Sequence, residues 1–200
     1  MEKQVIIVGA GLVGSLWAVY MSKKGYKVKV YERRSDVRKA EIVAGKSINL
    51  ALSDRGLKAL KNVGLDQVIL DELAIPMTGR IMHSLDGELS YQPYGKEGQA
   101  INSVSRGGLN IKMMNLAEEA GDVEILYDHQ CVGVDFDSNT ATFLNTKTGE
   151  TVSDSGEAIF ACDGAFSAVR YESMQKQMGF NYSQHYIEDG YKELLLPAND

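Results

Sequence analysis

The stretch VIIVGAGLVGS at residues 5–15 decides the fold. Its first four residues are a continuous β-branched apolar run, which is typical of a strand buried on both faces of a parallel sheet. Glycines follow at positions 9, 11 and 14, where the apolar spacing of a helix over 12–24 begins. The stretch therefore predicts a strand, a glycine-rich turn and a helix in direct succession.

Each glycine has its own task if this turn binds a dinucleotide. Gly9 allows the tight turn, Gly11 lets the backbone approach a pyrophosphate, and Gly14 permits close packing of helix on strand. The start of the helix offers unpaired N–H groups and the positive end of the helix dipole to the phosphates. A GxGxxG pattern alone is weak evidence, because glycine-rich turns also occur for purely structural reasons.

The sequence after this helix strengthens the prediction. Gly25 ends the helix, and residues 27–31 alternate as a second strand. Glu32 ends that strand, where a carboxylate accepts hydrogen bonds from a ribose diol. Residues 1–32 therefore predict a βαβ unit that binds a dinucleotide, and this pattern does not distinguish NAD(H) from FAD.

The rest of the chain contains segments with helical spacing and segments with the alternation of strands. Helices are predicted at 54–63, with Ser53 as the N-cap, and along 109–120. Short alternating segments at 78–104, broken by turn residues, predict antiparallel strands of a different sheet. Further strands are predicted at 123–127, 131–136, 141–145 and 158–161.

Composition narrows the class of function. The chain has 200 residues, of which 44% are hydrophobic and 24% charged, as in a globular protein. A net charge of -6 disfavours a nucleic-acid partner, because phosphate binding needs a basic surface. The longest apolar run, residues 5–20, is interrupted by glycines and falls short of a membrane span.

The cysteines and histidines indicate no metal site. Cys131 and Cys162 lack CxxC spacing, so we interpret both as reduced packing residues. His83, His129 and His185 share no ligand spacing and are assigned structural or exposed roles.

A second turn follows in FACDGAFSAVR at residues 160–170. An apolar strand runs into Asp163-Gly164, and a helix is predicted from Ala165 onward. Asp163 can accept hydrogen bonds from ribityl or ribose hydroxyls, and Gly164 lets the backbone come close to a cofactor. An ordinary Asp-Gly turn is the alternative interpretation.

Together the two turns resemble those of the flavoprotein aromatic hydroxylases, in which an aspartate-glycine motif near mid-chain serves both FAD and NADPH. Five blocks are similar to the kynurenine 3-monooxygenase branch of that family. They are GKSINLALSDRG (45–56), GRIMHSLDGELSYQPYG (79–95), INSVSRGGLN (101–110), CDGAFSAVR (162–170) and YSQHYIEDGYKEL (182–194). They cover nearly the whole chain in order.

The resemblance implies an α/β fold with an FAD/NAD(P)-binding Rossmann-like domain and an interwoven, incomplete antiparallel substrate-domain sheet. Residues 1–75 and 99–175 would form the FAD-binding domain. Residues 76–98 and 176–200 would supply the substrate-domain strands.

The resemblance also implies site residues. The expected cofactor-binding residues are Gly9, Gly11, Gly14 and Glu32 at the adenosine and pyrophosphate, Arg33 beside the adenine, Ala51 and Arg106 at the flavin, and Asp163 with Gly164. Arg80 and Tyr94 match the pair that holds the kynurenine carboxylate, since a guanidinium forks onto a carboxylate and a phenol adds one donor. The alternative interpretation of Arg80 is an ion pair at the surface, which is the usual role of a single arginine outside any motif. No side chain is expected to act as a catalytic acid, base or nucleophile.

The implied reaction is hydroxylation of L-kynurenine at carbon 3. NADPH reduces bound FAD, the reduced flavin takes up O2 as a C4a-hydroperoxide, and the distal oxygen goes to the ring. Members of the family are more than twice as long, so we expect an amino-terminal portion that is inactive alone. A cytoplasmic location is expected if the source is bacterial, with any membrane anchor in the missing carboxy-terminal part.

Two alternatives stay open from the sequence. The chain could be an NAD(P)-dependent dehydrogenase, which would leave the Asp163 turn and the Arg80 and Tyr94 blocks without a role. It could also be a non-catalytic FAD-binding remnant. A bound yellow chromophore separates a flavoprotein from a dehydrogenase.

Overall fold

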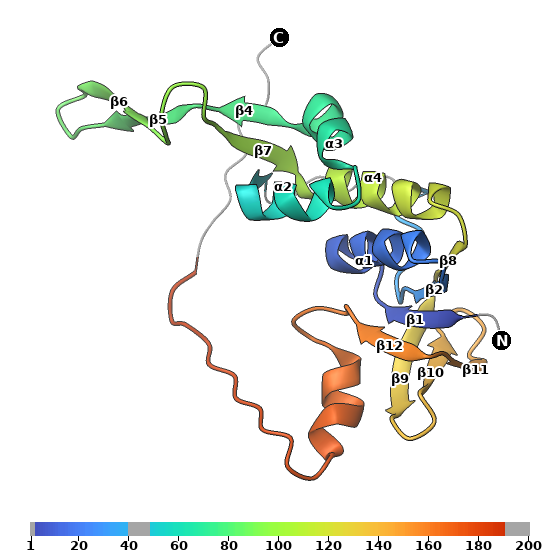
Figure 1. The fold of residues 1–200 in the computed structure, drawn as a ribbon. Helices are drawn as coiled ribbons and strands as arrows, with labels where there is room; N and C mark the ends of the chain where they lie inside the picture. The colour runs from blue at the N-terminus through green and yellow to red at the C-terminus, as the bar shows by residue number, and fades with distance from the viewer. Residues whose placement is uncertain (1–2, 40–48, 191–200) are drawn as a thin grey trace.

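The computed structural model describes residues 3–39 and 49–190, and a parallel sheet forms its centre (Figure 1). The four strands lie in the order β12–β1–β2–β8. They are β1 Gln4–Val8, β2 Lys27–Tyr31, β8 Val123–Leu126 and β12 Ala158–Ala161. The predicted strand, turn, helix and second strand at the amino end are all present, so the βαβ unit is confirmed.

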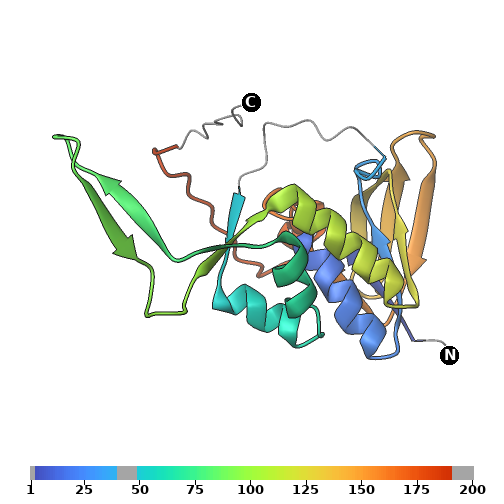
Figure 2. The same cartoon turned by 90° about the horizontal axis from the view of Figure 1, so that it is seen from above.

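Alternate residues of β1 face two different layers, as the period of a strand requires. Val5 and Ile7 pack in a cluster with residues of α1 (Leu12–Lys23) and α4 (Arg106–Glu119). Ile6 and Val8 pack in a separate cluster on the opposite face. The two helices lie side by side against one face of the sheet in both views (Figures 1 and 2). The continuous apolar run therefore reflects burial on both faces.

The other face is covered by a three-stranded antiparallel sheet in the order β11–β10–β9. Its strands are β9 His129–Asp135, β10 Thr140–Asn145 and β11 Thr151–Ser155. The rings of Tyr31 and Phe143 stack with centroids 3.7 Å apart. Asp154 accepts a hydrogen bond from the Tyr31 hydroxyl at 2.8 Å and forms an ion pair with Lys29 at 2.6 Å. Apolar stacking and one carboxylate thus join the two sheets.

A smaller sheet and two short helices lie beyond α1 and α4. The sheet has the order β3–β7–β4, with β3 Asn49–Leu52, β7 Ile101–Ser105 and β4 Ile75–Met77, and its pairings are antiparallel. The helices are α2 Asp54–Lys61, which was predicted, and α3 Asp66–Leu73, which was not. Ser53 occupies the N-cap position of α2 as expected.

A hairpin projects from this region, away from the body of the molecule (Figures 1 and 2). It consists of β5 Gly79–His83 and β6 Leu89–Pro93, which within the described ranges pair only with each other. Large apolar side chains are exposed along it, namely Ile81, Met82, Leu85, Leu89 and Tyr91. The prediction of antiparallel strands outside the parallel sheet is confirmed, whereas the domain boundaries stay a prediction.

The end of the chain departs from two expectations. The helix predicted from Ala165 begins later, with a π-helix at Val169–Ser173 and a 3-10 turn at Met174–Lys176. The cause is Asp163, whose Oδ2 accepts a hydrogen bond from the Val169 N–H at 3.2 Å and fixes the start there. Residues 177–190 form no strand and belong to none of the sheets of the described residues. Residues 45–48 of the block at 45–56 and residues 191–194 of the block at 182–194 lie outside the described residues.

A candidate cofactor site between the two turns

A cavity of about 470 Å³ lies where the parallel strands β1, β2 and β12 end. β1 has β2 on one side and β12 on the other, which makes this a topological switch point of the kind where open α/β sheets bind ligands. Seven of the nine predicted cofactor residues line it: Gly9, Gly11, Glu32, Arg33, Arg106, Asp163 and Gly164. The fold therefore brings the two turns to one place.

The first turn depends on two glycines for different reasons. Gly9 has φ +98°, and a methyl group on it would lie 2.8 Å from the carbonyl oxygen of Cys162. A methyl group on Gly14 would lie 1.9 Å from the carbonyl oxygen of Gly9. Gly14 thus permits α1 to pack against the turn, as the motif predicts, and it does not line the cavity.

Gly11 and the start of α1 offer backbone donors to the cavity. The first hydrogen bond of α1 runs from Ser15 N to the Gly11 carbonyl oxygen at 2.9 Å, and the N–H groups before it have no partner within the helix. Among the described residues, no atom other than those of its chain neighbours and its own helix lies within 4 Å of a methyl group placed on Gly11. A phosphate can therefore approach this backbone closely.

Glu32 joins the first turn to the segment that follows β2. Its Oε2 accepts from Ala10 N at 2.9 Å, and its Oε1 accepts from Arg34 N at 3.0 Å and Arg34 Nε at 2.8 Å. Burial alone would raise the pKa of Glu32, but these hydrogen bonds outweigh it and hold the pKa below its usual range. An anionic carboxylate thus stands at the cavity wall, as ribose binding requires.

Asp163 carries the clearest sign that the cavity accepts a polar group. One of its oxygens caps Val169, while the other, Oδ1, is buried and has no hydrogen-bond partner among the described residues. A buried carboxylate oxygen without a donor is costly, and such atoms normally find a partner. A hydroxyl of a ligand in the cavity is the partner that this oxygen fits. Gly164, at φ +84°, gives the backbone its sharp turn beside it.

The neighbourhood of the second turn also involves Arg170. Its guanidinium carbon lies 5.0 Å from the ring centroid of Tyr171 and 5.1 Å from that of Tyr182, and it donates a hydrogen bond to the Ala165 carbonyl oxygen. Tyr171 is one of the cavity residues. The segment after the short helices is thereby tied to the turn.

The structure adds cavity residues that the sequence did not single out. His129, which was assigned a structural or exposed role, lines the cavity beside Arg34 and Gln130. Its Nδ1 lies 2.6 Å from the Tyr127 carbonyl oxygen, and its ring meets Tyr31 edge-on at 5.8 Å. The available signal was position, because residues that follow the parallel strand at 123–127 must emerge at the same edge of the sheet as Glu32.

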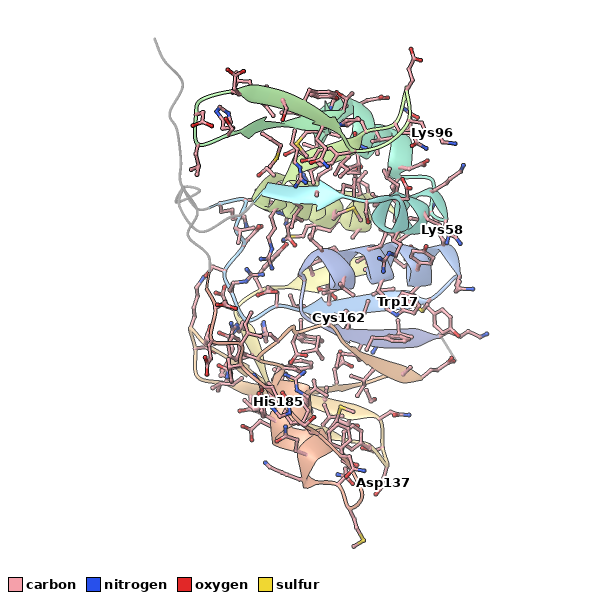
Figure 3. The ribbon with its side chains drawn as sticks, turned by 90° about the vertical axis from the view of Figure 1, so that its left-hand side faces the viewer. Trp17, Lys58, Lys96, Asp137, Cys162 and His185 are labelled. Atoms are coloured by element: carbon pink, nitrogen blue, oxygen red, sulfur yellow. The ribbon has the colours of Figure 1, made fainter. Side chains whose placement is uncertain are left out.

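Both cysteines are free and both line the cavity. Cys162, labelled in Figure 3, follows β12 near the middle of the molecule. Burial raises the pKa of each thiol to about 11. Both side chains are therefore neutral thiols, in agreement with their prediction as reduced packing residues.

The remaining predicted residues lie outside this cavity. Ala51 is exposed on β3. Arg80 lies on the hairpin and donates from Nε to Gln92 Oε1 at 2.8 Å. Tyr94, just after β6, lines a second hollow of about 600 Å³ together with Ser53 and Asp54. The register pairs Arg80 with Gln92, so alternation places Arg80 and Tyr94 on one face of the hairpin.

The described residues lack two kinds of feature. No helix there is both long and apolar enough to cross a membrane. No group of three or more histidine, cysteine, aspartate or glutamate residues there is arranged to hold a metal ion.

Several curated proteins that are similar to this chain have the same name. The chain is 46% identical over 195 residues to kynurenine 3-monooxygenase of Myxococcus xanthus, an alignment that covers 97% of this chain and 42% of that protein. It is 46% identical to the enzyme of that name from Christiangramia forsetii, in an alignment that covers 100% of this chain and 44% of that protein. For the Caenorhabditis elegans protein of that name, the identity is 42%, and the alignment covers 98% of this chain and 46% of that protein. The chain thus spans less than half the length of these relatives.

Solved structures show the same fold in more distant proteins. The tetrameric form of 2-methyl-3-hydroxypyridine-5-carboxylic acid oxygenase aligns with a TM-score of 0.66 at 23% identity, over 85% of this chain and 42% of that one. The flavin-dependent monooxygenase PieE, in complex with FAD and substrate, aligns with a TM-score of 0.69 at 17% identity. This alignment covers 86% of this chain and 32% of that one. A family model described as "FAD binding domain" matches residues 2–188, and the chain therefore belongs to this family of FAD-binding domains.

Proposed function

We propose that this chain binds FAD in the cavity between its two turns and forms the cofactor-binding part of a kynurenine 3-monooxygenase. The observation that carries the proposal is the convergence of Gly11, Glu32 and Asp163 on one cavity, with a buried Asp163 oxygen that lacks a donor among the described residues. The shared name of the relatives supports the substrate class.

Residues around the cavity suit different parts of the cofactor. Gly11 and the first turn of α1 would hold the pyrophosphate, and Glu32 would accept from the ribose hydroxyls, with Arg33 beside the adenine. Asp163 and Gly164 would hold the hydroxyl-bearing chain on the other side. Arg106 and Ala51 are proposed to contact the flavin ring.

FAD, when bound and reduced by NADPH, supplies the activation of O2 that hydroxylates an aromatic ring. The residues of this chain have a supporting part: they bind the cofactor, orient it and keep water from it. We propose that Arg80 and Tyr94 bind the carboxylate of L-kynurenine, and that the product is 3-hydroxykynurenine. No residue is proposed to act as a catalytic acid or base.

The cofactor assignment is tested by titrating the purified chain with FAD and, separately, with NAD⁺, following flavin fluorescence or heat. We expect saturable FAD binding, weakened roughly ten-fold by Asp163→Ala, which removes a charge-assisted hydrogen bond. Asp137→Ala, in the exposed turn between β9 and β10, is the control and should leave the affinity unchanged. Binding of NAD⁺ in preference to FAD would favour a dehydrogenase and overturn the proposal.

The substrate assignment is tested in an enzyme of the relatives' full length that carries this chain as its amino-terminal part. Arg80→Ala should raise the KM for kynurenine and leave the flavin content unchanged. The loss of binding free energy should be about 2–4 kcal/mol, the cost of losing a charge-assisted pair. Arg80→Lys should restore only part of the affinity, since an ammonium group cannot bind a carboxylate through two donors. An unchanged KM in the alanine variant would remove Arg80 from the substrate site.

A further inference from the structure

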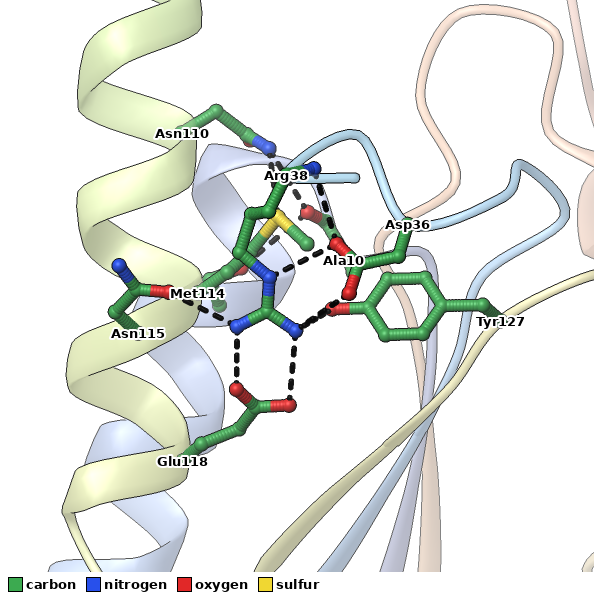
Figure 4. A network of polar contacts seen from close by, with 9 residues as sticks. Ala10, Asp36, Arg38, Asn110, Met114, Asn115, Glu118 and Tyr127 are labelled. Atoms are coloured by element: carbon green, nitrogen blue, oxygen red, sulfur yellow. Dashed lines mark hydrogen bonds and ion pairs between the residues drawn. The ribbon is translucent and has the colours of Figure 1, made fainter. Parts of the chain in front are cut away.

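A network of charges outside the cavity centres on Arg38 (Figure 4). Its Nε and Nη2 donate to the two carboxylate oxygens of Asp36 at 2.8 and 3.0 Å. Nη1 donates to Asn115 Oδ1 at 2.9 Å, and both Nη atoms reach the carboxylate of Glu118. Nη2 also donates to the Tyr127 hydroxyl at 2.9 Å. One side chain thus holds partners from three separate segments.

Each of these segments also supplies part of the cavity wall. Asp36 belongs to the segment after β2, which carries Glu32, Arg33 and Arg34. Asn115 and Glu118 lie on α4, whose first residue is the cavity residue Arg106. Tyr127 follows β8 and leads into His129, which lines the cavity as well. Arg38 itself is not among the cavity residues.

Backbone hydrogen bonds join two of these segments between Arg38 and the cavity. The His129 N–H donates to the Glu32 carbonyl oxygen at 2.9 Å, and the Asp128 N–H donates to the Arg34 carbonyl oxygen at 3.2 Å. The Ser35 hydroxyl donates to Asp128 Oδ1 at 2.5 Å. A displacement at Asp36 or Tyr127 therefore reaches the wall within a few residues.

We propose that Arg38 is a positioning residue that fixes the segment after β2 against α4 and Tyr127, so that Glu32, Arg33 and Arg34 face the adenosine half of FAD. The inference rests on the proposed function for the identity of the ligand. Arginine suits this place because its planar guanidinium presents five donors in a fixed geometry, and here they bridge two carboxylates, an amide and a phenol. Lysine cannot make these contacts together.

The test compares Arg38→Gln and Arg38→Lys with Lys112→Gln as the matched control. Lys112 also lies on α4 and pairs with a carboxylate, Glu72 at 2.7 Å, and its side chain is 26% exposed against 23% for Arg38. We expect Arg38→Gln to weaken FAD binding by the chain about ten-fold, and Arg38→Lys to lose most of that affinity too. Lys112→Gln should stay within about two-fold of the unmodified chain.

Amide hydrogen exchange without FAD gives a second readout, which separates positioning from general stability. Arg38→Gln should speed exchange at Arg34 and His129 and leave the amides of β1 unchanged. Unchanged FAD affinity, or exchange that rises equally in β1, would overturn the inference. If the unmodified chain does not bind FAD, the proposed function fails, and the exchange pattern still decides whether Arg38 holds the wall.

Discussion

At the scale of single residues, the glycines of the first turn differ in what a methyl group would meet. Gly14→Ala would place a carbon 1.9 Å from the Gly9 carbonyl oxygen, so helix and turn must separate. In the described structure, the methyl group of Gly11→Ala would meet no atom within 4 Å beyond its chain neighbours and its own helix, and the backbone keeps an allowed φ of -72°. The structure thus leaves open space beside Gly11 and close packing at Gly14, which agrees with the separate tasks that the motif predicts for them.

We therefore predict that the two substitutions affect different properties, stability at Gly14 and FAD affinity at Gly11. Gly14→Ala should lower the free energy of unfolding by about 3 kcal/mol, as expected for overpacking against rigid backbone. Gly11→Ala should cost no more than about 1 kcal/mol of stability but weaken FAD binding roughly ten-fold, because its methyl group occupies the approach to the backbone. Urea unfolding and FAD titration measure the two quantities, and equal stability losses would contradict this division.

Glu32 makes stability depend on pH in a known direction. Its pKa is lowered in the folded chain, so its hydrogen bonds stabilise the fold above the unfolded carboxyl value of about 4.3 and are lost as pH falls through the folded value. Glu32→Gln should cost about 1–3 kcal/mol at pH 7, and the difference from the unmodified chain should shrink below about pH 4.

Urea unfolding at pH 7, 5 and 3.5 measures this dependence. Glu119→Gln, at the exposed end of α4, is the control and should stay within about 0.5 kcal/mol throughout. A Glu32→Gln deficit that is constant across pH would show that the carboxylate charge does not matter.

At the scale of elements, the serines at the N-cap positions of α2 and α4 differ in their hydrogen bonds. Ser105 Oγ accepts from Gly108 N at 3.2 Å at the start of α4, whereas Ser53 makes no such side-chain bond in the described part of α2. Ser105→Ala should therefore cost about 1 kcal/mol, and Ser53→Ala close to nothing, in thermal or urea unfolding. Equal costs would mean that the Ser105 cap does not persist in solution.

The elements that the sequence predicted are those with strong local signals. β1, α1 and β2 have a β-branched run, a helical period and glycine stops, and the structure contains all three. α3 was missed because its N-cap is Leu65, which cannot cap with a side chain. β3 and β4 were missed because strands of four and three residues carry too little period to detect, and their partner β7 lies far along the chain.

The candidate site was predictable to a similar extent. Glycines and acidic residues in turns carry their signal locally, so Gly9, Glu32 and Asp163 were found and lie at one cavity. His129 and Gln130 join them only through the sheet order, which places the end of β8 beside that of β2. No local pattern marks such residues.

At the scale of the whole molecule, we predict that the hairpin is separable from the candidate cofactor cavity. Its strands pair only with each other in the described residues, and the Tyr94 N–H donates to the Thr78 carbonyl oxygen at 3.0 Å, so its two ends lie together. Replacing residues 79–93 by a short Gly-Ser linker should leave FAD affinity within about two-fold and stability within about 1 kcal/mol.

The same replacement in an enzyme of the relatives' full length that carries this chain should abolish kynurenine hydroxylation, because Arg80 is removed. Calorimetric titration with FAD and assay of 3-hydroxykynurenine measure the two outcomes separately. Loss of FAD binding by the replaced chain would show that the hairpin belongs to the cofactor site.

The position of β1 between β2 and β12 has a consequence for synthesis on the ribosome. One edge of β1 pairs as soon as β2 has emerged, but the other waits for β12, near the end of the described chain. At the usual speed of translation, about 5–20 residues per second, that edge stays open for roughly 6–26 s. An unpaired apolar strand is a hazard for association during this interval. Asp163 lies two residues after β12, so the nascent chain closes its sheet and brings Asp163 to the candidate cofactor cavity at nearly the same moment.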